Sequence, residues 1–314
     1  MNPKYSIVIP FYNERQSLTE LYQRLVKAVE PLGPFEMIFV DDGSTDGSFE
    51  VVRQLFTQDQ RVRALQLRKN FGKSAGLAVG FKAAGGEIVA TIDADLQDEP
   101  AEIQKLVMAL DHHDLVTGWK EHRHDPWTKT FPSWVFNSVL ARTLFGVKLH
   151  DLNSGLKVMR REVADSLDLY GEHHRFIPIL ASLNGFRVSE VPVVHHQRKY
   201  GQSKYGWNRF FRGAFDLLTI AFLARFQHRP LHLFGGIGAV FTIAGLAVLV
   251  YLSVLRFQGQ TIGNRPLLTF GVLGVLTGLQ FVFTGLLAEL ITSRSTERHY
   301  STRTELDHDR EHNR

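Results

Sequence analysis

The chain has 314 residues, of which 44% are apolar and 22% are charged, and its formal net charge is +4. The absence of cysteine excludes disulfide bonds and metal sites built on thiolates. The basic excess is modest and fits attraction to an anionic membrane leaflet, so we expect a membrane partner and no nucleic acid.

The first hundred residues alternate between strand and helix patterns. Short β-branched runs predict strands, and each is followed by a turn and then by an amphipathic or small-residue run that predicts a helix. Such alternation predicts an α/β fold, a parallel sheet with helices on both faces. The predicted strands are Tyr5 to Pro10, Phe35 to Val40, Val62 to Gln66 and Glu87 to Ile92, and the predicted helices are Ser17 to Val29, one that ends at Phe56, and Ser74 to Ala84.

Polar side chains follow the carboxyl end of each predicted strand. Because ligands bind outside the carboxyl ends of strands in open parallel sheets, we expect these clusters to share one site. It is not a dinucleotide site of the usual kind, since no G-x-G-x-x-G follows the first strand, and the sequence holds no P-loop motif. The clusters are Pro10 to Glu14, Asp41-Asp42, Lys73 and Asp93-Ala94-Asp95.

Asp93 and Asp95 form a D-x-D triplet at a strand end. Hard cations such as Mg²⁺ or Mn²⁺ bind carboxylate oxygens and keep coordination positions for phosphate oxygens. The triplet is common and indicates a metal site only together with its neighbouring clusters. Together with those clusters, the triplet predicts a binding site for Mg²⁺ or Mn²⁺, and this ion would bind the diphosphate of a nucleotide.

The composition changes after Pro230. No charged residue occurs from Leu231 to Leu255 or from Pro266 to Ala288, and each stretch exceeds the ~20 residues that cross a bilayer core. We therefore predict a transmembrane hairpin over residues 230–292, with spans at about 231–255 and 266–290. Gly274 and Gly278 form a small-xxx-small pair, which fits close packing of the two helices or, as a sharper alternative, a dimerisation face.

Arginines flank both ends of the predicted hairpin, with few in its loop. The positive-inside rule then predicts a multi-pass protein of the inner (cytoplasmic) membrane with both termini in the cytosol. No signal peptide is expected, because Met1 to Lys4 leads directly into a strand. Residues 207–229 predict an amphipathic juxtamembrane helix, with a packing helix as the alternative, and the charged tail 293–314 is expected to be disordered.

Six segments of the sequence carry a resemblance to a known family: Ser6 to Glu14, Val40 to Gly47, Arg68 to Lys73, Asp93 to Pro100, Asp151 to Lys157 and Arg198 to Tyr205. The first four resemble the signatures of family 2 glycosyltransferases with the GT-A fold. The last two are similar to the branch that glycosylates polyprenyl phosphates, which includes dolichyl-phosphate mannose synthase and bactoprenol glucosyltransferases. The resemblance covers roughly residues 5–225.

The resemblance implies a Rossmann-like, mainly parallel GT-A catalytic domain over residues 1–206. It implies inverting, metal-dependent transfer of one hexose from a nucleotide sugar to undecaprenyl phosphate or a similar polyprenyl phosphate on the cytosolic face. UDP-glucose is the preferred donor, and GDP-mannose or another nucleotide sugar is the alternative. A nucleotide-sugar-binding membrane scaffold without catalysis is the alternative from another class, and assembly as a homo-oligomer is left open.

The resemblance also assigns roles to residues. Asp95 is expected to hold the metal, with Asp93 between ribose and metal and Gln97 as a further ligand. Asp151 is the candidate base or orienting residue, with a plain turn cap as the alternative. Because a phosphate monoester has its second pKa near 6, general-base help is worth less for this acceptor. Donor-binding residues are Pro10, Tyr12, Glu14, Asp41, Asp42, Lys73, Asp93, Gln97, Arg198 and Lys204, and acceptor-phosphate residues are Lys120, Arg123 and Ser154.

Three histidine pairs occur, His112-His113, His173-His174 and His195-His196. Adjacent side chains on a strand or helix point apart, and no H-E-x-x-H spacing accompanies them. We therefore predict surface or core roles rather than metal ligation.

Overall fold

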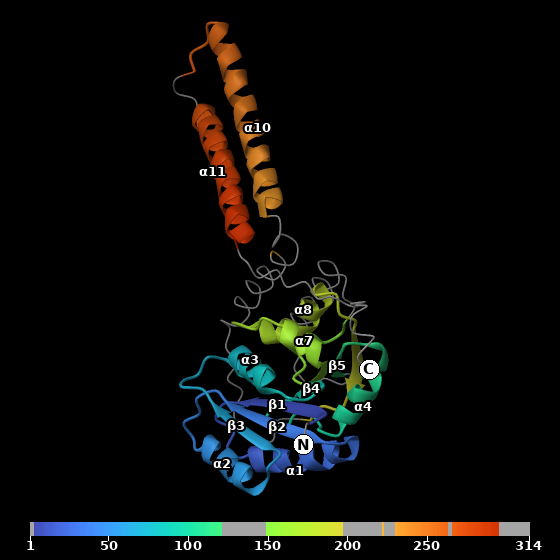
Figure 1. Cartoon of the computed structure of the whole chain (residues 1–314). Coiled ribbons are helices and arrows are strands. Elements are labelled where there is room, and N and C mark those ends of the chain that lie inside the picture. Colours follow the sequence, from blue (N-terminus) through green and yellow to red (C-terminus); the bar gives the residue numbers. More distant parts are fainter. Residues whose placement is uncertain (1–2, 121–148, 197–221, 223–229, 263–265, 295–314) are drawn as a thin grey trace. The chain divides into compact units, whose positions relative to one another are not determined.

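The computed structural model describes residues 3–120, 149–196, 222, 230–262 and 266–294 (Figure 1). It divides into two compact units, one with the residues before 217 and one with residues 217–300. The predicted helix over 207–229 and the predicted tail over 293–314 lie almost wholly outside the described residues.

The first unit contains a seven-stranded sheet of order β3-β2-β1-β4-β6-β5-β7. The strand β6 is antiparallel to β4 and β5, and the other neighbouring pairs are parallel, which confirms the predicted mainly parallel sheet. The strands are β1 (Tyr5–Phe11), β2 (Phe35–Asp41), β3 (Val62–Gln66), β4 (Ile88–Thr91), β5 (Leu115–Lys120), β6 (Lys157–Arg160) and β7 (Val188–Val193).

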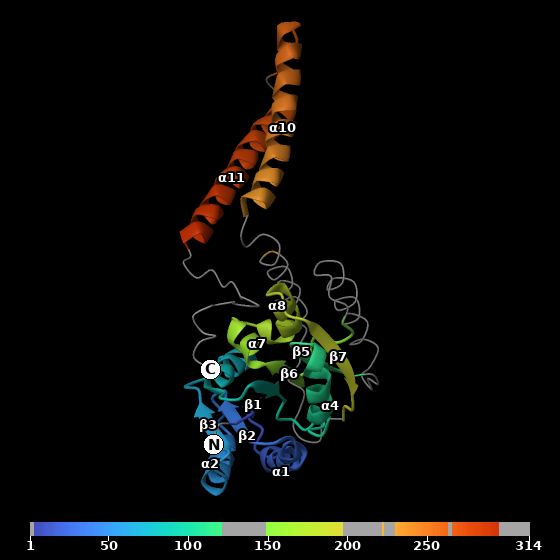
Figure 2. The ribbon, with the colours of Figure 1, turned by 45° about the vertical axis from the view of Figure 1, so that its right-hand side comes forward.

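Helices cover both faces of this sheet, as Figures 1 and 2 show. One core joins Ile7 and Phe39 of the sheet to the apolar sides of α1 (Leu18–Val29), α2 (Ser48–Gln58) and α4 (Glu102–Ala109). The other joins Val8 to α3 (Lys73–Ala83), α7 (Arg161–Ser166) and α8 (Ile177–Leu183). Since Ile7 and Val8 are successive residues of a strand, they point to opposite faces, which gives a three-layer α/β domain.

The second unit contains two long helices, α10 (Pro230–Phe257) and α11 (Pro266–Arg294), each long and apolar enough to cross a membrane. Their backbones approach closely at glycines: a Cβ added to Gly245 would lie 2.7 Å from the Gly271 oxygen, and one added to Gly274 would lie 3.2 Å from the Gly245 Cα. Gly274 therefore packs inside the hairpin, as the first of the two predicted alternatives requires. The Glu289 carboxylate accepts the Leu231 N–H at 3.3 Å, which satisfies a backbone donor at the start of α10.

Candidate functional site

Asp41 and Asp42 stand where β2 ends. Both are buried. Asp41 accepts the Ser44 N–H and the Gln66 side-chain amide, each at 2.9 Å. These hydrogen bonds fix the turn that follows β2. The buried Asp41 carboxylate therefore stabilises this edge of the sheet and is not part of its exposed surface.

The Asp42 carboxylate holds the loop that precedes α3. It accepts the Phe71 N–H at 2.7 Å and the Gly72 N–H at 2.9 Å. Burial raises the pKa of Asp42, and the nearby Asp41 adds to the effect, although the two N–H donors oppose it. Gly43 lies beside this loop with φ +74°, and a Cβ there would lie 2.6 Å from the Lys69 carbonyl carbon, so only glycine fits.

The turn after β1 is joined to the turn after β2. Asn13 takes a left-handed φ of 56°, donates its N–H to Ser44 Oγ at 2.9 Å and accepts the Thr45 N–H at 2.8 Å. Glu14 donates its N–H to Ser48 Oγ at 3.0 Å. The predicted donor residues Tyr12 and Glu14 are therefore half-buried on a turn that is fixed to the Asp42 turn.

Asp93 and Lys73 form the central ion pair of the edge. Lys73 begins α3, and its Nζ lies 2.5 Å from Asp93 Oδ1. Burial opposes ionisation of Asp93, but the Lys73 ammonium, with smaller contributions from Lys120 and Lys157, lowers its pKa to about 2. The Asp93 side chain is still 33% exposed, so a ligand can reach it.

Two glycines allow close packing around this site, one of them against Asp93 and the other against Pro10. A Cβ at Gly155 would lie 2.6 Å from the Asp93 carboxyl carbon, so only glycine lets the Asp151–Leu156 loop lie against Asp93. A Cβ at Gly76 would lie 3.3 Å from the Pro10 Cβ, which places α3 directly against the end of β1. The residues predicted to bind the donor and the Asp151 loop thus meet at Asp93.

Asp95 and Gln97 follow Asp93 on a tight turn. Asp95 is 8% exposed, its carboxylate accepts the Gln97 N–H at 3.2 Å, and Leu96 between them has a left-handed φ of 61°. Among the described residues no group of three or more His, Cys, Asp or Glu side chains could hold a metal. Two carboxylates and one amide still fit Mg²⁺ or Mn²⁺, because such ions take only one or two protein carboxylates when phosphate supplies the remaining oxygens.

Asp151 and Ser154 lie on the loop between β5 and β6 and are each 1% exposed. The Asp151 carboxylate accepts the Asn153 N–H at 3.1 Å, the geometry of a turn cap. The Ser154 hydroxyl donates to the Leu156 carbonyl at 3.4 Å. Both predicted residues therefore form hydrogen bonds within their own loop.

Lys120, predicted to bind the acceptor phosphate, ends β5 with its Nζ 3.8 Å from Asp98 Oδ1. Three other predicted cations, Arg123, Arg198 and Lys204, lie outside the described residues.

Two further titratable residues face this site: Lys157, for which no role was predicted, and His174, a member of one of the histidine pairs predicted to have surface or core roles. Lys157 is 3% exposed and donates to the Ser154 carbonyl, and burial together with the Lys73 ammonium lowers its pKa to about 8. His174 is 9% exposed and shares a hydrogen bond of 3.0 Å with Ser74 Oγ, and burial lowers its pKa to about 2. The sequence did hold one sign that Lys157 is buried. It lies two residues before Met159 in a short strand, which puts both side chains on one buried face.

The pair His195-His196 joins the end of β7 to the loop after Asp95. His195 Nδ1 lies 3.1 Å from Asp98 Oδ1, and His196 Nε2 lies 3.1 Å from Glu99 Oε2. Both histidines thus connect two segments of the fold through carboxylates. They also hold the loop directly before the segment that begins at residue 197.

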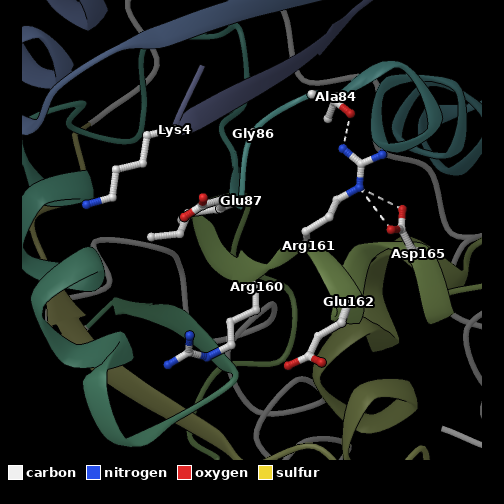
Figure 3. Close-up of a pocket in the computed structure, with 10 residues that line it drawn as sticks. Lys4, Ala84, Gly86, Glu87, Arg160, Arg161, Glu162 and Asp165 are labelled. Atoms are coloured by element: carbon white, nitrogen blue, oxygen red, sulfur yellow. Dashed lines mark hydrogen bonds and ion pairs between the residues drawn. The ribbon is translucent and has the colours of Figure 1, made fainter. Parts of the chain in front are cut away.

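An open cavity of about 710 Å³ lies elsewhere, where β1 and β4 begin (Figure 3). Its wall includes Arg160 and Arg161, but Arg161 is engaged by Asp165 at 2.8 Å and by the Ala84 carbonyl. It occupies the opposite sheet edge from the predicted aspartates, and none of the predicted site residues lines it.

Residues 6–168 match the family described as Glycosyl transferase family 2, and this span is more than half of the chain. The chain belongs to glycosyltransferase family 2. The family assignment confirms the resemblance seen in the motifs, and it makes the edge with Asp42, Asp93 and Asp95 the candidate active site of a glycosyltransferase.

This family 2 chain is 38% identical over 294 residues to the dodecaprenyl-phosphate galacturonate synthase of Rhizobium johnstonii, a match that covers 91% of the chain and 87% of the relative. Its fold is similar to that of glucosyl-3-phosphoglycerate synthase from Mycobacterium tuberculosis. The structure of that protein with Mn²⁺ and UDP-glucose matches with a TM-score of 0.53 at 22% identity, over 70% of this chain and 79% of that one. Its complex with phosphoglyceric acid matches with a TM-score of 0.53 at 20% identity, over 71% and 80%.

Proposed function

We propose that this glycosyltransferase moves one sugar from a nucleotide sugar to a polyprenyl phosphate at a membrane surface. The observation that carries the proposal is the match to a dodecaprenyl-phosphate galacturonate synthase over 91% of the chain. A match of that extent includes most of the apolar hairpin as well as the catalytic unit. The chain therefore shares with this relative both a family 2 domain and the segment suited to a lipid acceptor.

On the donor side, Asp93, Asp95 and Gln97 would hold Mg²⁺ or Mn²⁺. The fold neighbour with Mn²⁺ and UDP-glucose supports a divalent ion in this fold. The ion would supply positive charge to the diphosphate as it leaves. Lys73 stands beside Asp93 and adds a cation of the chain at the same place, while Pro10, Tyr12, Glu14 and Asp42 would line the nucleoside pocket.

On the acceptor side, Asp151 orients the lipid phosphate for attack on the sugar C1. A phosphate monoester is largely dianionic at neutral pH, so its oxygen attacks without first losing a proton to a strong base. Lys120 would contribute positive charge for this phosphate, together with Ser154, and Arg123 is assigned the same role. One displacement without a covalent intermediate inverts the anomeric centre.

The identity of the donor sugar is the most specific part of the proposal. UDP-glucose is preferred because the two predicted spans resemble the architecture of bactoprenol glucosyltransferases, and GDP-mannose is the alternative nucleotide sugar. The name of the Rhizobium relative adds a nucleotide-activated galacturonate as a third donor to test. A scaffold that binds nucleotide sugar without catalysis is disfavoured because Asp93, Asp95 and Asp151 are all present at one edge.

The hairpin α10–α11 would anchor the enzyme in the cytoplasmic membrane. The helices are long and apolar enough to cross it. From the flanking arginines and the positive-inside rule we infer that the catalytic unit and both termini lie in the cytosol.

The test uses the full chain, purified in detergent, with polyprenyl phosphate and Mg²⁺ or Mn²⁺. Radiolabelled UDP-glucose, UDP-galacturonate and GDP-mannose are supplied in separate reactions, and Asp95→Ala serves as the inactive control. A lipid-extractable monosaccharide with one donor is the expected product. Polymer, or no product with any donor, would overturn the proposal.

A further inference from the structure

Four polar residues occupy neighbouring positions across four strands of the sheet. In the strand register Thr91 pairs with Lys157, Lys157 pairs with Thr117, and Thr117 pairs with Glu190. Residues that pair on adjacent strands point to the same face, so these side chains form one transverse row. We name them the polar row; it runs through β4, β6, β5 and β7.

Three members of the polar row bind the backbone of the loop that carries Asp151. The Thr91 hydroxyl donates to the Gly155 carbonyl at 2.8 Å, and the Lys157 ammonium donates to the Ser154 carbonyl. The Glu190 carboxylate accepts the His150 N–H at 2.7 Å and the Asp151 N–H at 3.4 Å. The loop is thus held at its start by an anion and at its end by a cation and a hydroxyl.

Thr117 stands between Lys157 and Glu190 in the row and is the exception. It is fully buried, and within the described part of the chain its hydroxyl oxygen has no hydrogen-bond partner. An unpaired buried hydroxyl destabilises a fold, so it is rarely retained without a use. The two residues that pair with it in the register, Lys157 and Glu190, both bind the backbone of the Asp151 loop.

The charges of the row also connect the two substrates. Lys157 is close enough to Asp93 on the donor side and to Asp151 on the acceptor side for both carboxylates to stabilise its charged form. Glu190 acts on the same loop from the opposite end. A change of either charge therefore acts on the alignment of the acceptor residue with the donor.

We propose that the polar row positions Asp151 for sugar transfer, with Lys157 and Glu190 as positioning residues and with the Thr117 hydroxyl bonding to the loop in its substrate-bound arrangement. The inference rests on the proposed transfer to a lipid phosphate. It assigns the row to the acceptor step and leaves donor binding to Lys73, Asp93 and Asp95.

The test compares lipid transfer with donor hydrolysis by water in the full-length enzyme. The variants are Lys157→Met, Lys157→Arg, Glu190→Gln, Thr117→Val and Thr117→Ser, and the matched controls are the exposed Lys82→Met and Glu162→Gln. We expect Lys157→Met and Glu190→Gln to lower kcat for lipid transfer about 10-fold to 100-fold, because misplacement of a reacting group by about 1 Å has effects of that size. The donor KM should stay within about threefold, and the ratio of hydrolysis to transfer should rise.

Thr117→Val separates a positioning role from a structural one. Valine has nearly the same shape and removes an unpaired hydroxyl, so the melting temperature should hold or rise while transfer falls. Thr117→Ser keeps the hydroxyl and should retain transfer, and Lys157→Arg should recover part of it.

An unchanged ratio of hydrolysis to transfer in Lys157→Met, Glu190→Gln and Thr117→Val would overturn the inference, whereas the proposed function would stand on the wild-type product. Equal losses of donor binding and transfer, together with a lower melting temperature in every variant, would also overturn it. Absence of lipid-linked sugar from the wild-type enzyme would overturn the proposed function and this inference together.

Discussion

The Lys73 ammonium lies 2.5 Å from the Asp93 carboxylate, so one of the two carboxylates predicted to hold a divalent ion is already paired with a cation of the chain. Both side chains remain about one-third exposed, at 30% and 33%. A metal ion that binds Asp93 would compete with Lys73 for the same oxygens. We therefore expect the ammonium to turn toward the donor diphosphate when Asp93 binds the ion.

Lys73→Met should weaken binding of the nucleotide sugar. A hydrogen bond to a charged group contributes about 1.5–3 kcal/mol, which corresponds to about 10-fold to 100-fold in affinity. Calorimetric titration with the nucleoside diphosphate measures the change, and Lys82→Met, an exposed lysine of the same helix, is the control. Equal affinities of the two variants would show that Lys73 serves Asp93 alone.

Asp95→Ala should abolish the metal-dependent part of donor binding and, with it, transfer. The carboxylate lies in a turn, where it accepts the Gln97 N–H at 3.2 Å. Because the carboxylate serves this turn, we expect the fold to persist without it. Mn²⁺ titration followed by electron paramagnetic resonance measures binding directly, with Asp111→Ala, an exposed aspartate, for comparison. Full turnover of the wild-type enzyme in EDTA would remove the ion from the mechanism.

The strands and helices of the first hundred residues follow local patterns, and this is why the sequence predicts their bounds within a few residues. The contacts that shape the site are not local. Asp42 is bonded to residues 29 and 30 positions away, and Lys157 meets Thr117 only because β6 enters the sheet antiparallel between β4 and β5. Periodicity carries no information on that strand order, so it could show Asp93 and Asp95 at an edge but not the row beneath Asp151.

Gly245→Val should disrupt the hairpin. A Cβ at this position would lie 2.7 Å from the Gly271 oxygen and 2.7 Å from the Val275 nitrogen, so the helices would have to separate. Gly236→Val is the matched control on α10, because nothing lies within 4 Å of its Cβ position. Thermal unfolding in detergent should show a lower transition for the first variant alone; similar transitions would show that the helices do not depend on this contact.

Stability should fall as the pH drops below about 6.5, in part through His174. Its pKa is 6.5 in the unfolded chain and about 2 in the folded one, so between these values the unfolded chain binds one proton more. The free energy of unfolding then decreases by up to about 1.4 kcal/mol for each unit of pH lost.

His174→Gln should flatten this dependence between pH 7 and 5, although it lowers stability at pH 7 through the lost contact with Ser74. The melting temperature across that range measures the slope, and His112→Gln, at an exposed site, should keep the wild-type slope. The same slope in His174→Gln as in the wild type would mean that His174 protonates without unfolding.

Asp151→Asn decides whether the acceptor needs a base. The carboxylate is 1% exposed and accepts the Asn153 N–H, so its orientation is fixed before any substrate arrives. If it only orients a phosphate that is already ionised, kcat should fall about 10-fold to 100-fold, the lower part of the range for general acid–base catalysis. If it is the obligatory base, the loss should exceed about 10⁴-fold and should lessen as the pH is raised.

Lys120→Ala supplies the complementary test of the acceptor side. Because its charge would bind the lipid phosphate equally in the ground state and the transition state, its loss should raise the lipid KM and leave donor affinity unchanged. Its ion pair with Asp98 is long, at 3.8 Å, and therefore weak. The lysine can leave this pair and bind a phosphate with little loss of free energy. An unchanged lipid KM with weakened donor binding would mean that Lys120 belongs to the donor side and that the two sides of the site have been assigned the wrong way round.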